Sequence, residues 1–253
     1  MNHRQGFKIH HFASLLKHPL KEVRTCVGQV LKEAGVTCMG WICDKLWEFF
    51  NFFRKKPCMS ISKEAIDHLF NDARTANGFV DKAVPLSLLK EIYEIAKMGA
   101  TSMNSQPARY VFLTTPEAKA RLMPAMSPGN VDKTNSAPVS VIVATDSQFF
   151  EHMPTVFPNN PNAKAMFEGN AALAAATASR NGTLSGAYFM IAARALGLDC
   201  GPMSGLDAAK VNAEFFPDGR YTTNFVINLG YGDSTKLFAR NPRLSFEQVV
   251  QVL

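Results

Sequence analysis

The chain has 253 residues, 47% of them hydrophobic and 19% charged, so it can bury a core and is not a disordered chain. Its formal net charge is +6, but residues 1–58 carry ten Lys or Arg against four Asp or Glu, whereas residues 59–253 carry seventeen of each. The basic excess therefore lies in the N-terminal part, and the remainder offers no basic field to attract a nucleic acid.

The same boundary separates the cysteines. Four of the five cysteines and both tryptophans precede Met59, which leaves Cys200 alone in the rest of the chain. No C-x-x-C pair occurs, so we predict no metal site, and a lone cysteine over this length favours a reducing, cytoplasmic location. We expect an N-terminal extension of unknown role over residues 1–58 and one domain over residues 59–253, for which Met59 resembles a natural start.

The extension contains no secretory signal and no apolar run of the roughly 18 residues that a membrane span needs. Its most apolar part, residues 41–53, carries three charges and precedes the cations of residues 54–56. One alternative is an interfacial amphipathic helix lying on a membrane. The other is an accessory element, or an upstream reading frame joined to a protein that begins at Met59.

The domain opens with two predicted helices. Ser62 can cap a helix over residues 63–73, and Pro85 suits the first turn of a second helix that ends at Gly99. Helical spacing predicts the buried stripe of the second helix to be Leu88, Leu89, Ile92, Ile95 and Ala96.

Three further elements and a long connection follow. We expect a strand over residues 109–114, a helix over residues 116–126 and a strongly β-prone buried strand over residues 139–144. The stretch 146–168 is rich in proline and reads as a long excursion or lid. Its aromatic side chains either screen a site or simply pack together, and both alternatives stay open: Phe149, Phe157 and Phe167.

A long alanine-rich helix over residues 170–196, closed by Gly197, begins the last part of the domain. Its small residues Ala178, Gly182 and Gly186 recur every four positions, which predicts the close approach of another helix. The remaining elements are a strand over residues 224–229 and a helix over residues 245–252. Helices packed on a small sheet indicate an α+β fold.

Motifs with a fixed chemistry are scarce in this domain. The glycines of residues 228–234 follow a strand, as in a dinucleotide-binding fingerprint, but the third glycine is absent and Pro242 interrupts the expected helix. No phosphate-binding P-loop, G-x-S-x-G or H-E-x-x-H motif occurs, and only His68 and His152 follow Met59. The candidates that remain are polar groups on loops that flank the predicted elements.

Four segments, taken together and in this order, resemble the FMN-dependent nitroreductase family over essentially the whole of residues 59–253. They are residues 70–75 (FNDART), 101–109 (TSMNSQPAR), 197–205 (GLDCGPMSG) and 228–240 (NLGYGDSTKLFAR). The most similar branch is a short one that includes malonic semialdehyde reductases. The resemblance implies an α+β fold with a mixed or antiparallel sheet flanked by helices, and a homodimer with FMN at the subunit interface.

The resemblance also implies a set of cofactor-binding residues. Arg74 and Arg243 match positions that bind the FMN phosphate, for which guanidinium donors are well suited, and Arg240 is a neighbour of the same kind. Thr75 matches a hydroxyl position at the flavin or its phosphate. Asn77 stands where many relatives carry Lys or Arg.

Two further segments complete the implied site. Ser102, Asn104 and Gln106 match a loop that faces the ribityl chain and the edge of the flavin ring, whose carbonyl and N–H groups suit an amide. The other segment matches backbone that passes flavin N5 and can donate an N–H to it: Pro202, Met203, Ser204 and Gly205.

From the family we expect an oxidoreductase in which NADH or NADPH delivers a hydride to flavin N5 and an organic substrate then receives it, in a ping-pong cycle without a catalytic side chain. The branch implies reduction of malonic semialdehyde to 3-hydroxypropionate. The alternatives are a broad quinone or nitroaromatic reductase and a flavin-binding module without turnover. The expected partners are a second copy of the chain and a small carbonyl, quinone or nitro compound, with no nucleic acid.

Overall fold

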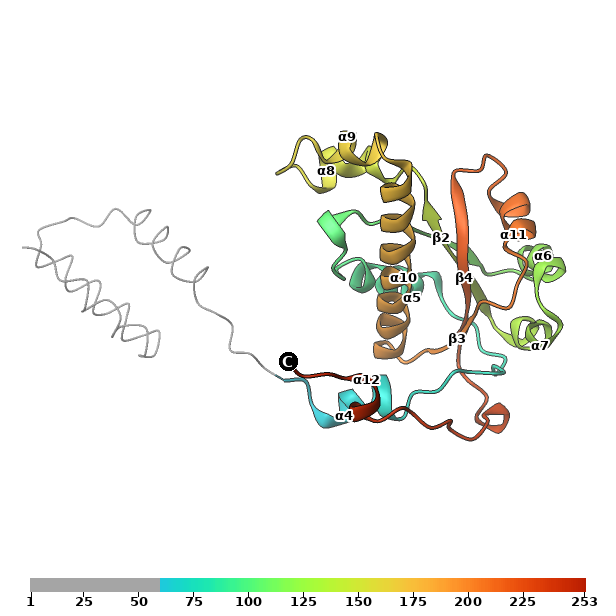
Figure 1. Cartoon of the computed structure of the whole chain (residues 1–253). Helices are drawn as coiled ribbons and strands as arrows, with labels where there is room; N and C mark the ends of the chain where they lie inside the picture. The colour runs from blue at the N-terminus through green and yellow to red at the C-terminus, as the bar shows by residue number, and fades with distance from the viewer. Residues whose placement is uncertain (1–59) are drawn as a thin grey trace, which may run out of the picture. The chain divides into compact units, whose positions relative to one another are not determined.

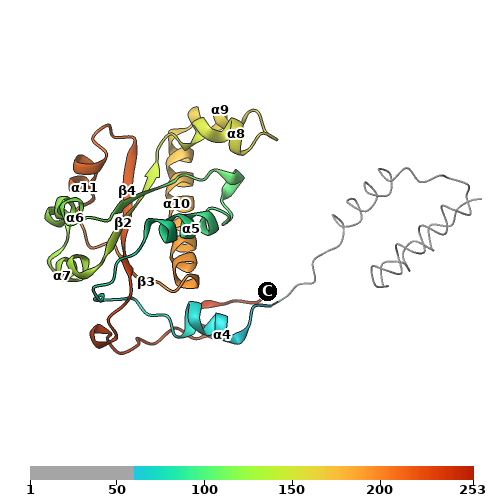
Figure 2. The same ribbon diagram turned by 180° about the vertical axis from the view of Figure 1, so that it is seen from behind.

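The computed structural model describes residues 60–253, so the predicted extension over residues 1–58 and its membrane alternative lie outside the described residues. The described part is an α+β fold in which helices cover both faces of a four-stranded sheet (Figure 1). Figure 2 shows the same layers from behind. The predicted fold class is confirmed.

The sheet is antiparallel throughout, with the order β1-β2-β4-β3. Its strands are β1 (Ala108–Leu113), β2 (Val139–Asp146), β3 (Asp199–Met203) and β4 (Tyr221–Gly230). Three of them were expected, whereas β3, which contains Pro202, was not. A proline has no N–H to donate to the hydrogen-bond ladder. It is tolerated here because β3 is an edge strand. The antiparallel sheet also agrees with the sequence argument against a dinucleotide-binding fold at residues 228–234.

The central strands have two buried faces, as their continuous apolar sequence predicts. Val141 and Val143 pack on one side against α5 (Leu86–Ala96) and α10 (Ala171–Ala195). The alternate residues Ile142 and Ala144 belong to the core on the other side. Because side chains alternate along a strand, one apolar run serves both helical layers.

Helix α5 begins after Pro85, as predicted, but its buried stripe is narrower than expected. Leu89, Ile92 and Ala96 are buried, and their spacing of three and four residues defines the face turned to the sheet. Ile95 lies off this face and is 46% exposed, so the prediction that it is buried was wrong.

The long helix α10 has the predicted ends. The Asn170 side chain accepts a hydrogen bond from the Leu173 backbone N–H, and Gly197 ends the helix with φ of 81°. Its glycines contact the sheet instead of another helix. A Cβ on Gly182 would lie 2.3 Å from Thr145 Cγ2, and a Cβ on Gly186 would lie 2.4 Å from Phe225 Cζ. The expectation that these glycines admit a second helix was therefore wrong, because they admit strands β2 and β4.

Three helices cover the other face: α6 (Pro116–Leu122), α7 (Pro128–Ser136) and α11 (Ala208–Phe215). Helix α6 was predicted to continue to residue 126, but a 3-10 turn, Met123–Ala125, replaces its end. Pro124 explains the change, since it has no N–H to continue the α-helical ladder. The sequence reading missed α7 and α11.

The excursion of residues 146–168 folds into short helical pieces, which are a 3-10 turn (Phe149–His152), α8 (Met153–Val156) and α9 (Ala163–Glu168). Phe149 and Phe167 are buried, with 0% and 2% exposure, and their rings contact edge to face. With Ala178 of α10 they belong to a separate small core. The packing alternative for these aromatics is therefore the one that the structure supports.

The terminal helices are shorter than predicted. Ser62 caps α4 (Lys63–Ile66) as expected, but a π-helical turn, Asp67–Asn71, follows and the helix ends before residue 73. The closing helix α12 spans Phe246–Val249 within the predicted residues 245–252. None of the helices described in residues 60–253 is long and apolar enough to cross a membrane.

Candidate functional site

The segment that contains Arg74, Thr75 and Asn77 runs beside the start of β3. Thr75 forms a parallel bridge with Cys200, and the Ala76 N–H donates to the Cys200 carbonyl oxygen at 3.0 Å. A Cβ on Gly201 would lie 2.7 Å from the Ala76 carbonyl oxygen, so this approach requires glycine. Cys200 itself is fully buried, and burial raises the pKa of its thiol to about 12.

The C-terminal part of the chain meets the same segment. The Arg74 guanidinium donates to the Phe238 carbonyl oxygen, and Arg240 Nη2 donates to the carbonyl oxygens of Asn71 and Ala73, the latter at 3.0 Å. These hydrogen bonds join the segments that carry Arg74 and Arg240, two of the three predicted arginines, although the bonded residues are more than 160 positions apart.

The third arginine is placed differently. Arg243 Nη1 donates to the carbonyl oxygens of Asn241 and Pro242, at 2.9 and 3.2 Å, which belong to its own segment. The family resemblance assigned the FMN phosphate to Arg74 and Arg243, with Arg240 as their neighbour. In the structure, Arg240 is the one that contacts the Arg74 segment.

The predicted segment 202–205 continues from β3. The Met203 side chain is buried, whereas Ser204 and Gly205 are exposed. The Gly205 carbonyl oxygen accepts hydrogen bonds from the Ser127 N–H at 3.1 Å and from Asn130 Nδ2 at 2.7 Å. The N-terminal turn of α7 therefore fixes this backbone. Asn130 was missed, because nothing in its local sequence signals a partner 75 residues away.

The loop with Ser102, Asn104 and Gln106 has an unusual backbone. Met103, Asn104 and Gln106 have φ of 52°, 51° and 43°, in the left-handed region that non-glycine residues rarely adopt. Asn104 Nδ2 donates to the Val156 carbonyl oxygen of α8 at 2.8 Å, and Gln106 Nε2 donates to Asn104 Oδ1 at 3.1 Å. The two predicted amides are thus bonded to each other, and Asn104 is also bonded to the excursion.

A pocket of about 430 Å³ lies behind this loop. The loop and β1 form part of its wall, and His152 and Val156 of the excursion form another part. Ser105 also lines it and is 1% exposed, and its Oγ has no hydrogen-bond partner among the described residues.

The predicted residues fall into two groups that contact α10 at different positions along its axis. The Ser102 N–H donates to Asn181 Oδ1 at 2.7 Å, whereas Arg194 Nη1 donates to the Leu69 carbonyl oxygen beside the Arg74 segment. Asn181 and Arg194 are thirteen residues apart, which corresponds to about 20 Å along a helix. Both views show the loop before β1 well separated from α4 (Figures 1 and 2). One copy of the chain therefore does not bring all the predicted residues together.

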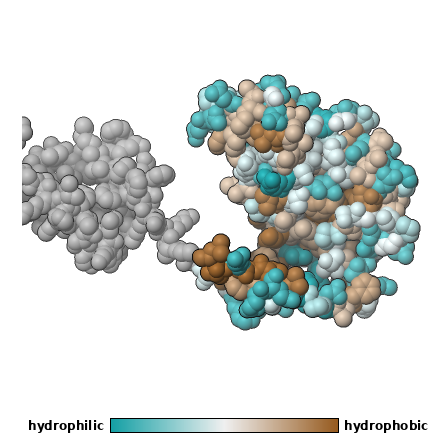
Figure 3. Space-filling view, viewed as in Figure 1, coloured by the Kyte–Doolittle hydropathy of each residue, from teal (hydrophilic) through white to brown (hydrophobic). Residues whose placement is uncertain are grey.

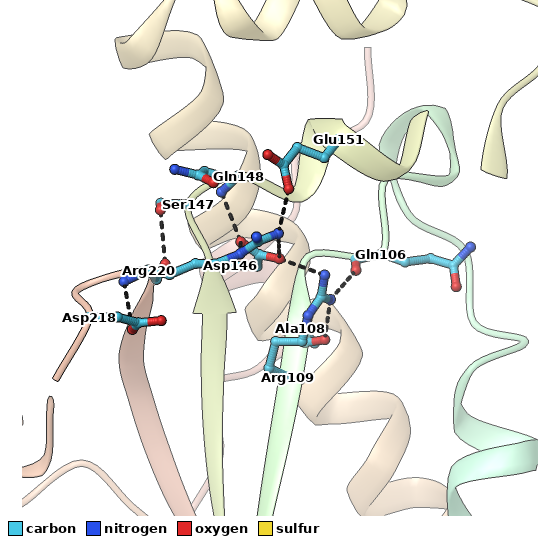
Figure 4. A network of polar contacts seen from close by, with 9 residues as sticks. All are labelled: Gln106, Ala108, Arg109, Asp146, Ser147, Gln148, Glu151, Asp218 and Arg220. Carbon is cyan, nitrogen blue, oxygen red and sulfur yellow. Dashed lines mark hydrogen bonds and ion pairs between the residues drawn. The ribbon is translucent and has the colours of Figure 1, made fainter. Parts of the chain in front are cut away.

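A charged network that the sequence did not reveal lies at the end of β2 (Figure 4). Asp146 is fully buried and accepts hydrogen bonds from Arg109 Nη2 at 2.7 Å, from Arg220 Nε at 3.0 Å and from the Gln148 N–H at 2.9 Å. Burial by itself raises the pKa of Asp146, but these hydrogen bonds and the charges of the two arginines outweigh it and hold that pKa below its ordinary value.

The lowered pKa of Asp146 gives a dependence of stability on pH. Because the folded protein binds the proton more weakly than the unfolded chain, the carboxylate stabilises the fold above the ordinary pKa of about 3.9, and this stabilisation is lost as the pH falls through the folded value. We expect Asp146→Asn to lower the free energy of unfolding by about 3 kcal/mol at pH 7. The difference from wild type should narrow below about pH 4. Urea denaturation between pH 3 and 7 measures the free energy of unfolding of both proteins. A difference in this free energy that does not change with pH would contradict the prediction.

Among residues 60–253, no group of three or more His, Cys, Asp or Glu side chains is arranged to hold a metal ion. The predicted arginines and amides are found at the contact of residues 71–75 with residues 238–240 and at the loop before β1.

The sequence is similar to a described family and to named bacterial proteins. The model of the Nitroreductase family matches residues 71–231. A "Putative NADH dehydrogenase/NAD(P)H nitroreductase" of Stenotrophomonas maltophilia (strain R551-3) is 53% identical over 193 residues, which are 76% of this chain and 98% of that protein. HadB of Ralstonia pickettii, which bears the same description, is 52% identical over 182 residues, or 71% of this chain and 93% of that protein.

Solved structures share the fold at lower identity. The "putative nitroreductase ydfN" of Bacillus subtilis has a TM-score of 0.69 and 22% identity, and covers 76% of this chain and 100% of its own. A "putative nitroreductase in complex with FMN" of Exiguobacterium sibiricum has a TM-score of 0.68 and 17% identity, and covers 77% and 99%. The family model matches more than half of the chain, and relatives of nearly full length are about half identical to it. The chain belongs to the nitroreductase family.

Proposed function

We propose that this protein is an FMN-dependent NAD(P)H oxidoreductase. Its family supports the proposal, as do relatives about half identical whose names describe NADH dehydrogenase or NAD(P)H nitroreductase activity. A protein of the same fold was solved in complex with FMN. The structural observation that carries the proposal is that the segments of Arg74 and Arg240, from opposite ends of the domain, are joined by hydrogen bonds from both arginines.

The arginine pair fits a phosphate group. A guanidinium has five N–H donors, and the hydrogen bonds of Arg74 and Arg240 use only some of them. Within residues 60–253, neither arginine forms an ion pair with a carboxylate. Two guanidinium groups that have free N–H donors and no carboxylate partner are suited to bind a phosphate dianion. In the proposed site Arg74, Arg240 and Thr75 hold the phosphate.

The remaining residues suit the other end of the cofactor. The exposed backbone of Ser204 and Gly205 continues from the strand beside Thr75, and Asn130 holds it in place. Asn77 Nδ2 donates to the Thr75 carbonyl oxygen at 3.3 Å. FMN, when bound, supplies hydride acceptance from NAD(P)H and hydride donation to a second substrate. The protein supplies orientation, and we assign it no catalytic side chain.

We further propose that the site is completed by a second copy of the chain. The loop with Asn104 and Gln106 attaches to α10 at Asn181, about 20 Å along the helix from Arg194, which contacts the chain just before Arg74. The loop can therefore face a flavin held by another subunit more readily than one held by its own.

An exposed apolar surface supports this homodimer. Hydrophobic side chains gather over α4 and the C-terminal segment, where Figure 3 shows the brown atoms concentrated. Large exposed apolar patches are uncommon on monomers and mark interaction surfaces. The surface comprises Ile61, Ile66, Phe70, Leu244, Phe246 and Val249, each at least 40% exposed.

For the substrate, we propose malonic semialdehyde, which accepts one hydride from the cofactor and one proton from solvent to give 3-hydroxypropionate. This choice rests on the resemblance of the four sequence segments to the branch that includes malonic semialdehyde reductases. A quinone or nitroaromatic compound is the alternative within the same chemistry, and a flavin-binding protein without turnover is the alternative outside it. We also propose one catalytic domain over residues 59–253 and a cytoplasmic location, since Cys200 is the only cysteine in those residues.

Two measurements on the full-length protein test these proposals. The purified protein should be yellow, and anaerobic NADH or NADPH should bleach it; a yellow protein that is not bleached would favour the module without turnover. Steady-state kcat/KM values are then compared for malonic semialdehyde, menadione and nitrofurazone. We expect the aldehyde to have the highest value by at least tenfold. Equal or lower values for the aldehyde would overturn the substrate assignment and leave the oxidoreductase assignment intact.

A further inference from the structure

The buried carboxylate of Asp146 connects three separate parts of the chain. It lies at the end of β2, it binds Arg109 from β1 and Arg220 from the turn before β4, and it caps the backbone of Gln148 at the start of the excursion (Figure 4). Arg220 Nη2 also lies 2.9 Å from the Glu151 carboxylate. Two arginines and two carboxylates make this cluster neutral, so its burial does not leave an unpaired charge.

One arm of the cluster reaches the loop before β1. Arg109 Nη1 donates to the Gln106 carbonyl oxygen at 3.0 Å and to the Ala108 carbonyl oxygen at 2.9 Å. Gln106 has a positive φ, a conformation that costs a non-glycine residue free energy and persists only where the surroundings hold it. Asp146 fixes the orientation of the guanidinium that holds this carbonyl group.

The other arm reaches the excursion. Glu151 belongs to the 3-10 turn that leads into α8, and the Val156 carbonyl oxygen of α8 accepts the hydrogen bond from Asn104. The loop and the excursion are thus attached to one carboxylate from two directions, and they also contact each other. Between them lies the pocket of about 430 Å³, lined by Gln106 and Arg109 on one side and by His152 and Val156 on the other.

We propose that Asp146 is a positioning residue: through Arg109 it holds the loop of residues 102–106, and through Arg220 and Glu151 it holds the excursion, in the arrangement that borders this pocket. The functional part of this inference rests on the proposed function, in which the loop faces the flavin. Asp146 then acts on the cofactor through the loop, without touching it.

Four variants of the full-length protein separate this role from general stabilisation. Asp146→Asn weakens both the contacts through Arg109 to the loop (the loop arm) and the contacts through Arg220 and Glu151 to the excursion (the excursion arm). Arg109→Lys affects the loop arm alone, because an ammonium cannot reproduce the guanidinium fork, and Glu151→Gln affects the excursion arm alone. Glu214→Gln is the matched control, since it weakens the surface pair of Arg121 and Glu214, which lies on α6 and α11 away from the loop.

Hydrogen–deuterium exchange provides the first readout and requires no cofactor. We expect Asp146→Asn to raise exchange at least tenfold in peptides covering residues 101–108 and 147–157. Arg109→Lys should raise exchange in the first peptide only, Glu151→Gln in the second only, and Glu214→Gln in neither. Exchange is compared at times too short for the strands of the sheet to exchange, because the lower global stability of Asp146→Asn raises strand exchange by itself. Unchanged exchange in both segments at those times would overturn the positioning role.

The affinity for FMN, measured by quenching of flavin fluorescence, provides the second readout. We expect the Kd to rise about tenfold in Asp146→Asn and to change less than twofold in Glu214→Gln. If wild type binds FMN and Asp146→Asn binds it equally well, the functional part of the inference fails. If wild type does not bind FMN, the proposed function fails, whereas the exchange experiment still decides whether Asp146 positions the loop.

Discussion

Replacing Arg74 with glutamine lowers the affinity for FMN by about 10- to 100-fold, because a charge-assisted hydrogen bond contributes about 1.5–3 kcal/mol. The substitution retains a polar side chain of similar reach and removes the positive charge. Titration of the full-length protein with FMN, followed by the quenching of flavin fluorescence, measures the change in Kd.

The controls distinguish loss of the phosphate contact from disturbance of the C-terminal segment, to which Arg74 also donates. Arg74→Lys keeps the charge and should recover part of the affinity. Arg240→Gln should weaken binding to a similar degree as Arg74→Gln, and Arg121→Gln, on the surface near α11, should have no effect. An Arg74→Gln protein that binds FMN within twofold of wild type would contradict the proposed phosphate site.

Arg243→Gln is tested in the same titration. The family resemblance assigns Arg243 to the FMN phosphate, whereas in the structure Arg243 bonds to its own segment. Its contacts with Asn241 and Pro242 lead us to expect a smaller effect from Arg243→Gln than from Arg240→Gln. An equal loss of affinity would support the assignment of Arg243 to the FMN phosphate that the resemblance implies.

Replacing Gly186 with alanine destabilises the domain by about 2 kcal/mol. Alanine favours a helix by about 1 kcal/mol over glycine, but the new methyl group would lie 2.4 Å from Phe225 Cζ and 3.4 Å from Val143 Cγ1, so the helix and the sheet must separate or the phenyl ring must move. Urea denaturation at pH 7 measures the free energy of unfolding.

Gly129→Ala is the matched control for this prediction. Gly129 also lies in a helix, α7, but a Cβ there meets nothing within 4 Å. The same chemical change should therefore stabilise the domain by up to about 0.5 kcal/mol. If both variants change stability by the same amount, the close packing of α10 on the sheet does not limit the residue at position 186.

The sequence predicted those elements whose signal is local. The apolar run of β2 and the alanine-rich pattern of α10, with Asn170 before it and Gly197 after it, are visible within single windows. β3 was missed because a Gly-Pro pair reads as a turn, and only its place at the edge of the sheet makes a strand possible.

The candidate site was predictable in part. The family resemblance supplied Arg74 and Arg243, with Arg240 as a neighbour, and the fold joins the segments of Arg74 and Arg240 whereas Arg243 bonds within its own segment. The resemblance could not show that the loop of Asn104 and Gln106 attaches to α10 far from the contact of Arg194. The Asp146 cluster gave no sequence signal, since its arginines lie 37 and 74 residues away and no helical or strand spacing connects them.

The burial of Cys200 has a chemical consequence. Alkylating agents and peroxides react with thiolates, and a thiol whose pKa is about 12 is almost wholly protonated at neutral pH. The sulfur is also fully enclosed, in the strand that pairs with β4 on one side and contacts Thr75 on the other. Carboxymethylation of Cys200 therefore requires local opening of β3 at the edge of the sheet. Its rate measures how often that opening occurs.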